Sequence, residues 1–229
     1  MEHPDTIIAM ANLASSYGKL GKFTEAEKLN IQVLDASKRI LGVGHPDTII
    51  AMTNLASSYG KLGKFTEAEK LKIQILNARK RFLGGEHPHT ILAMGNLASS
   101  YAKLGKYTEA DKLNIQVLDA SKRIFGVEHP NTILAMANLA VTYQCLGKYT
   151  AAETLEIQVL DVRSRILGVQ HPHTILAMDN LAATLRCLGK YKEAGKLVTQ
   201  AQALKNRLIG ATSHDANAAT ANVQAAEET

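Results

Sequence analysis

The chain has no tryptophan, only two cysteines and only five prolines among its 229 residues. So few cysteines exclude a small disulfide-stabilised fold, and so little proline excludes a collagen-like or proline-rich disordered chain. No segment reaches the roughly 18 consecutive apolar residues of a membrane span, so we expect no membrane partner. The opening residues 1–4 carry no secretory signal pattern. Together these absences favour a folded cytoplasmic protein.

The dipeptide His-Pro occurs five times, each time 42 residues after the last. A fixed period of this size is typical of one supersecondary unit repeated in tandem, so the sequence predicts an array rather than a single-core globule. The first two copies, 3–44 and 45–86, agree at 34 of 42 positions. We therefore predict a five-repeat array over residues 1–212, followed by a polar C-terminal capping helix or tail over 213–229. The predicted repeats start at His3, His45, His87, His129 and His171.

Two apolar stripes predict two helices in each copy. Both stripes have the three-and-four residue spacing that places side chains on one face of a helix. Neither helix can bury its stripe alone, so we expect neighbouring pairs to stack and share a continuous core. In the first copy the stripes are Ile7, Met10, Ala14, Tyr17 and Leu20, then Ala26, Leu29, Val33, Ile40 and Leu41.

Residues typical of helix ends stand beside both stripes. Pro4 suits the first turn of the first helix, and Gly21 suits a left-handed C-terminal cap. Thr24 and Glu27 have the spacing of a capping box, so we expect them to begin the second helix and Gly42 to end it. Each copy is thus predicted to be a helix of about 16 residues, a short turn and a helix of about 17. The corresponding capping boxes in copies two and three are Thr66–Glu69 and Thr108–Asp111.

These repeated residues resemble a known family. The series Asn12–Leu13–Ala14, Tyr17, Gly21, Phe23, Ala26 and Leu34 resembles a tetratricopeptide repeat. The 42-residue period and the His-Pro-Asp-Thr opening are similar to the longer subtype found in kinesin light chains. The resemblance implies an all-α, right-handed superhelical solenoid of five helix-turn-helix repeats. It also implies a non-catalytic module whose first helices line a concave groove that binds an extended peptide or protein segment.

Two alternatives stay open for the parent molecule. Near-identical arrays of this subtype also resemble the ligand-sensing ends of nucleotide-binding immune-type receptors, and the kinesin-light-chain resemblance implies the cargo-binding part of an adaptor. The sequence contains neither a heptad coiled coil nor a Gly-x-x-x-x-Gly-Lys-Ser/Thr phosphate loop. Either attribution therefore requires the chain to be a fragment.

The candidate ligand contacts are residues of the first helices that lie off the apolar stripe. One asparagine per copy occupies such a position, and a row of carboxamides can hydrogen-bond the backbone of an extended peptide whatever its sequence. The alternative is that each asparagine bonds to the neighbouring repeat. Three lysines on the same face favour an acidic or carboxylate-ended ligand, although lysines are also commonly just solvated. The predicted peptide-binding residues are Asn12, Asn54, Asn96, Asn138, Asn180, Lys19, Lys61 and Lys103.

Other functions have weaker support. The repeat-opening histidines would lie one repeat apart, too far to share a metal ion, so we expect them to pack at the turns between repeats. The net charge is +5, but basic and acidic residues interleave in every copy without an aromatic row. We therefore expect no nucleic-acid partner. No nucleophile–base pair or phosphate loop stands out from the repeat pattern, so we expect neither catalysis nor a cofactor.

Stacked copies would keep the two cysteines apart. Cys145 and Cys187 occupy equivalent positions in adjacent copies, about 10 Å apart in a stack of helices, whereas a disulfide needs Cα atoms within roughly 7 Å. We therefore expect free thiols.

No preceding repeat within the chain covers the apolar stripe of the first copy, so we also expect weak end-to-end self-association.

Overall fold

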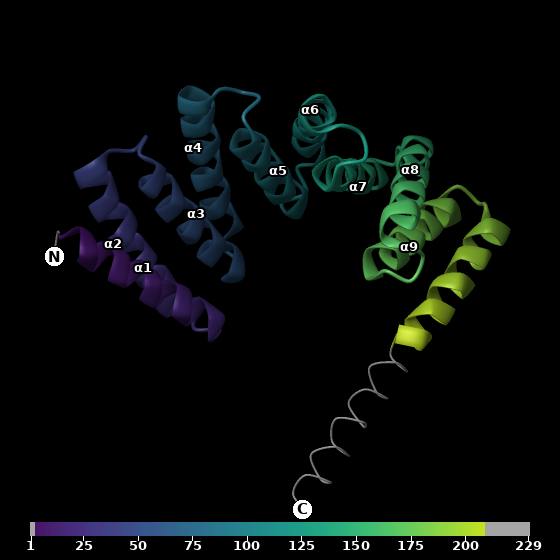
Figure 1. Ribbon diagram of the computed structural model, residues 1–229, viewed down its shortest axis with the longest axis horizontal. Helices are drawn as coiled ribbons and strands as arrows, with labels where there is room; N and C mark the ends of the chain where they lie inside the picture. The colour runs from purple at the N-terminus through teal and green to yellow at the C-terminus, as the bar shows by residue number, and fades with distance from the viewer. Residues whose placement is uncertain (1–2, 209–229) are drawn as a thin grey trace, which may run out of the picture. The chain divides into compact units, whose positions relative to one another are not determined.

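The computed structural model describes residues 3–208, and all regular structure in this range is helical (Figure 1). Each of five first helices begins at the proline of a His-Pro pair, and a second helix follows after a short turn. The chain divides into two compact units, Met1–Ala135 and Met136–Thr229, whose boundary falls within helix α7. The expected C-terminal cap at 213–229 lies outside the described residues. The helices are α1 (Pro4–Lys19), α2 (Phe23–Leu41), α3 (Pro46–Lys61), α4 (Phe65–Leu83), α5 (Pro88–Lys103), α6 (Tyr107–Phe125), α7 (Pro130–Cys145), α8 (Tyr149–Leu167) and α9 (Pro172–Cys187), with a last helical segment over 191–208.

Helix pairing confirms the predicted helix-turn-helix repeats. The first helices have 16 residues and the second helices 19. In the first unit, each helix from α1 to α5 packs against the next one along the chain, and in the second unit α8 packs against α9. Gly21 and Gly42 have the positive φ angles of 74° and 83° that end α1 and α2. Glycine adopts this left-handed conformation without the steric cost that a Cβ atom would add.

Small residues allow the helices to pack closely. Ala14 and Ala26 are each only 2% exposed, and their counterparts in the other four copies are as deeply buried. A buried alanine lets two backbones approach while costing almost no side-chain entropy. The expectation for the stripe ends was wrong, because Leu20, Ile40 and Leu41 are all at least 40% exposed. Leu20 is the C-cap of α1, and Ile40 and Leu41 stand at the end of α2, where they line a cavity together with residues of α3.

The His-Pro-x-Thr opening of each copy caps a helix and contributes to packing between helices. The Nδ1 atom of each opening histidine accepts a hydrogen bond from the backbone N–H two residues later, at 3.1–3.3 Å, and so caps the first helix. The threonine that follows is completely buried in four copies. Thr90 donates to the Gly84 carbonyl at 2.8 Å, and Thr132 donates to the Gly126 carbonyl at 2.7 Å. The opening thus joins first helices of the later copies to the end of the second helix before them.

The capping boxes expected at Thr24–Glu27, Thr66–Glu69 and Thr108–Asp111 do not form. The second helices begin one residue before each threonine, and the residue at the N-cap is a lysine whose side chain makes no capping bond. Glu27 is held elsewhere, because Lys64 of the next repeat donates to its two carboxylate oxygens at 2.6 and 2.7 Å. The lysine offers the carboxylate a charged donor, whereas a capping box would offer it only a neutral backbone N–H.

The same lysine–glutamate pair joins second helices of neighbouring repeats along the chain. Within the first unit, Lys106 donates to Glu69 at 2.8 Å, and within the second, Lys190 donates to Glu153 at 2.6 and 2.9 Å. The hydrogen bond to the carboxylate raises the pKa of each lysine in these pairs above its ordinary value of 10.5. A tyrosine ring stands about 5.7 Å below the ammonium groups of Lys64 and Lys106. The carboxylate and the ring therefore both favour the charged lysine.

This arrangement predicts a loss of stability at alkaline pH. A lysine pKa that is raised in the folded state contributes stability that is fully present below 10.5 and is lost as the pH rises through the folded-state value. We expect the variant K64M/K106M to be less stable than the wild type at neutral pH, with the difference shrinking as the pH rises above 10.5. Urea denaturation followed by circular dichroism over this pH range measures the effect. The matched control K70M/K112M removes two exposed lysines of the same helices, and an equal loss in the control would contradict the assignment.

Candidate functional site

The first helices present one exposed apolar residue and one asparagine in each copy. We call the surface that these positions form within each unit the first-helix face. The apolar side chains are about half exposed, although large apolar residues are most often buried. They alternate along the helix with the buried residues that form the core. The apolar residues of this face are Ile8, Ile50, Leu92, Leu134 and Leu176, and the asparagines are Asn12, Asn54, Asn96, Asn138 and Asn180.

The asparagine side chains are available to a ligand. Four of them are exposed, and Asn180 is half-buried. Their backbone carbonyls accept bonds from nearby side chains, as Asn54 does from the Ser58 hydroxyl at 3.3 Å. Within the described part of the chain, however, none of the five carboxamides makes a hydrogen bond to a neighbouring repeat. The alternative of a purely structural ladder therefore finds no bond to support it.

An apolar cavity of about 260 Å³ lies between α1, α2 and α3. Ile8 and Ile50 contribute to its wall, and the asparagines Asn12 and Asn54 stand at its polar side. Asp47 is the charged residue among those that line it. We call it the apolar cavity. It is large enough to hold one apolar side chain of a peptide whose backbone passes the two asparagines.

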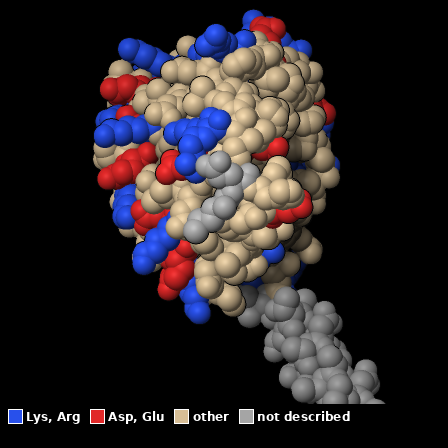
Figure 2. All heavy atoms as spheres, turned by 90° about the vertical axis from the view of Figure 1, so that its left-hand side faces the viewer, with Lys and Arg blue, Asp and Glu red and all other residues tan. Residues whose placement is uncertain are grey.

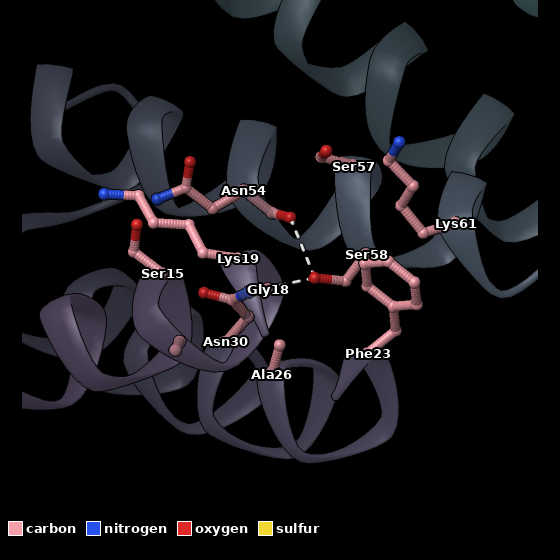
Figure 3. A pocket seen from close by; sticks show the side chains of 11 residues that line it. Ser15, Gly18, Lys19, Phe23, Ala26, Asn30, Asn54, Ser57, Ser58 and Lys61 are labelled. Atoms are coloured by element: carbon pink, nitrogen blue, oxygen red, sulfur yellow. Dashed lines mark hydrogen bonds between the residues drawn. The ribbon is translucent and has the colours of Figure 1, made fainter. Parts of the chain in front are cut away.

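A second cavity, of about 270 Å³, lies further along the same three helices (Figure 3). It brings together Lys19 from α1 with Asn54 and Lys61 from α3, three of the residues predicted to bind peptide. Figure 3 shows Lys19 and the Asn54 carboxamide extending toward the same side of this cavity. Asn30 and Ser58 close its floor through a hydrogen bond of 3.0 Å. We call it the lysine cavity.

A third cavity, of about 290 Å³, lies between α3, α4 and α5. It contains Asn96, one of the predicted residues, together with two cations that were not predicted, Lys72 and Arg79. The Lys72 ammonium donates to the Ser100 hydroxyl at 2.6 Å and to the Asn96 carbonyl at 3.3 Å. The Arg79 guanidinium donates to the His89 carbonyl at 2.8 Å. We call it the cationic cavity.

Comparisons with known proteins agree with this architecture. The tetratricopeptide repeat model matches residues 5–80, 50–113, 90–164 and 138–207. The chain belongs to the tetratricopeptide repeat family. Arrays of this family typically bind other proteins or peptides. No curated protein sequence matches the chain.

Solved structures place this tetratricopeptide array with the kinesin-light-chain-like subtype, as the sequence predicted. It is similar to a putative kinesin light chain with nearly identical TPR-like repeats from Podosopora anserina, with a TM-score of 0.79 and 29% identity over 91% of this chain and 99% of that one. A point variant of that protein has a TM-score of 0.81 and 28% identity over 91% and 98% of the two chains. BtubC (BKLC) from P. vanneervenii shares the fold, with a TM-score of 0.76 and 20% identity over 88% and 80%.

One interior position of the tetratricopeptide array differs sharply between copies. Asn30 occupies it in copy one and Lys72 in copy two, and each bonds to a serine of the following first helix. In the second unit the position holds Glu156, whose carboxylate accepts from Gln144 at 2.8 Å. Burial raises the pKa of Glu156. The sequence analysis missed these residues because it considered the positions at which the copies agree. The signal that could have found them is the small number of positions at which the copies differ.

The cysteines, the possible metal ligands and the surface charges of the array are weaker candidates for a functional site. Cys145 and Cys187 are free and exposed. No group of three or more histidine, cysteine, aspartate or glutamate residues is arranged for a metal ion within residues 3–208. Crossing a bilayer would take a longer and more apolar helix than any that the structure describes. Figure 2 shows basic and acidic side chains interleaved on the face it presents, as the sequence predicted.

Proposed function

We propose that this array is a non-catalytic binding module for an extended peptide or protein segment, which lies along the first-helix face. The main support for this proposal is the row of asparagines, whose side-chain carboxamides have no hydrogen-bond partner among the described residues. A carboxamide offers a donor and an acceptor, the two groups that a peptide backbone presents. The apolar cavity beside Asn12 and Asn54 adds room for a ligand side chain.

An acidic ligand suits the first unit best. The lysine cavity has Lys19 and Lys61 in its lining and no acidic residue among the described residues around it. Lys103 is also exposed on α5. Cations that face a partly enclosed space attract an acidic segment and fix its position more than its affinity.

A second candidate is the cargo-binding part of a kinesin-light-chain-like adaptor. The similarity to a putative kinesin light chain over nearly the whole of both chains favours it. This candidate uses the same face and differs in the parent molecule. Nothing that we observe in residues 3–208 specifically favours the alternative of a nucleotide-binding immune-type receptor.

We also propose a cytoplasmic site of action, with neither nucleic acid nor a membrane as a partner. Interleaved charges like those in Figure 2 do not form the single basic stripe that a phosphate backbone requires.

Weak end-to-end self-association is proposed as well. Leu13 is 46% exposed in copy one of this chain, whereas its counterpart Leu55 in copy two is 3% exposed.

The asparagine row gives the central test. A peptide is selected from a random library on the intact protein, and its affinity is measured by calorimetry. Replacing Asn54 and Asn96 by alanine should weaken binding by about 1 kcal/mol for each hydrogen bond lost, with little change in melting temperature. The matched control is N77A, an exposed asparagine of α4. A sharp drop in melting temperature with unchanged affinity would show that the row is structural.

The lysine cavity gives a test of charge. We expect K19E/K61E to weaken an acidic peptide at low ionic strength and to flatten the salt dependence of its affinity, because both charges act across water-accessible space. The control K28E/K70E makes the same change on the exposed surfaces of α2 and α4. Equal losses in both variants would mean that net charge, rather than the cavity, attracts the peptide.

Self-association is tested by sedimentation equilibrium. The L13Q variant removes exposed apolar surface at the start of the array and should reduce association at high concentration. The control I115Q replaces a comparably exposed isoleucine of α6. A wild-type protein that stays monomeric throughout would contradict the proposal.

A further inference from the structure

The differences between copies one and two gather at the cationic cavity. These copies differ at eight of their 42 positions. Six residues of copy two line the cavity, and four of the eight differences fall among those six. Copies one and three carry asparagine and serine where copy two carries the two cations. The four differing residues are Thr53, Lys72, Ile75 and Arg79.

Among residues 3–208, the two cations have no negatively charged partner. Lys72 and Arg79 are bonded to a hydroxyl group and to backbone carbonyls, all of them neutral. No aspartate or glutamate is among the described residues that line the cavity. Burial lowers the pKa of Lys72, and the charge of Lys103 lowers it further. Burial also lowers the pKa of Arg79. Half-buried positive charge of this kind is usually paired, because unpaired charge is costly away from water.

The apolar cavity, one repeat earlier, differs in chemistry at the same place. Val33 and Ser37 stand there where Ile75 and Arg79 stand in the cationic cavity. The apolar cavity has an acidic residue, Asp47, in its lining and no cation among the described residues around it. The two cavities occupy equivalent places in successive repeats but favour different ligand side chains. The apolar cavity favours an apolar side chain, and the cationic cavity favours a negatively charged one.

We propose that the cationic cavity binds an acidic side chain of the peptide and thereby fixes the register of that peptide along the array. The proposal rests on the proposed function, because it requires a peptide on the first-helix face. The asparagine row and the apolar residues repeat with little change, so they hold a peptide equally well after a shift of one repeat. Lys72 and Arg79 together distinguish this position, because the second unit repeats the arginine as Arg163 but has Glu156 in place of Lys72.

The spacing of the cavities defines the ligand further. Helix α3 lines both cavities, so they are separated by about the 10–12 Å width of one helix, and an extended chain advances about 3.3 Å per residue. An apolar side chain in the apolar cavity and an acidic one in the cationic cavity are then about three residues apart. The preferred segment carries an apolar residue and an aspartate or glutamate at this separation.

Nuclear magnetic resonance titration tests the proposal, because it detects weak binding and locates it. The probes are blocked octapeptides of glycine and serine that contain one leucine and one glutamate three positions apart, in both orders. Their counterparts contain glutamine in place of glutamate, or glycine in place of leucine. We expect the glutamate peptide of one order to shift the Arg79 Nε–H signal and nearby backbone amides saturably. Loss of the carboxylate should weaken binding about tenfold, the size of one charge-assisted hydrogen bond.

The chain itself supplies the matched variant. K72N/R79S gives copy two the residues that copies one and three already carry, so it should fold. It is expected to bind the glutamate and glutamine peptides equally weakly. The control K80N/R81S removes the same charge from exposed positions of α4 and should keep the tenfold preference.

Several results would overturn the inference. Equal binding of the glutamate and glutamine peptides by the wild type would do so, as would an unchanged preference in K72N/R79S. The absence of a saturable shift in the cavity with any peptide would also reject it. If sodium acetate binds there as tightly as the glutamate peptide, the cavity takes free carboxylates and sets no peptide register. Peptide shifts on the first-helix face without a glutamate preference would leave the proposed function standing, whereas shifts confined to the second helices would remove both.

Discussion

The close approach of neighbouring helices at buried alanines is the constraint on which the rest of the structure depends. A single helix pair has too little apolar surface to be stable alone, so each pair must pack against the next. Ala14 and Ala26 permit this packing, and their counterparts return unchanged in every copy. Once the backbones are this close, contacts between copies follow at fixed places. The Lys64–Glu27 pair and the Thr90 hydroxyl bond are two of these contacts.

Because these contacts hold neighbouring copies together, single positions on the first-helix face and just inside it are free to vary in chemistry. Most of this face repeats, which suits recognition of a peptide backbone, since the backbone repeats as well. Specific recognition requires that some position be unlike the others. Asn30, Lys72 and Glu156 show how one site can change from neutral to positive to negative while the surrounding helices keep their packing.

The helices were predictable from the sequence because local signals determine them. Proline at the first turn, glycine at a left-handed end and apolar spacing act within a few residues. The structure confirms the first two for α1 and the apolar spacing for α3, where Ile49, Met52 and Ala56 are buried. The capping boxes were not predictable in the same way. Glu27 has the right spacing from Thr24, but a lysine 37 residues later competes for it, and only the packing of the two repeats reveals that competition. The candidate site divides likewise: Asn54 and Lys61 could be named from their positions on a helix, whereas Lys72 reaches the same face from a second helix.

The pairing of one copy with the next has a consequence for how the gene can change. Each contact joins a residue of one copy to a residue in the following copy, and the partners are nearly identical throughout. An in-frame deletion of residues 45–86 by unequal recombination would place Lys106 beside Glu27 and Ser100 beside Asn30, the same residue types that pair now. The shortened protein would keep its interior intact and yet lose Lys72 and Arg79 together. Recombination between copies can therefore remove the cationic cavity in a single step while the contacts that hold neighbouring copies together are kept.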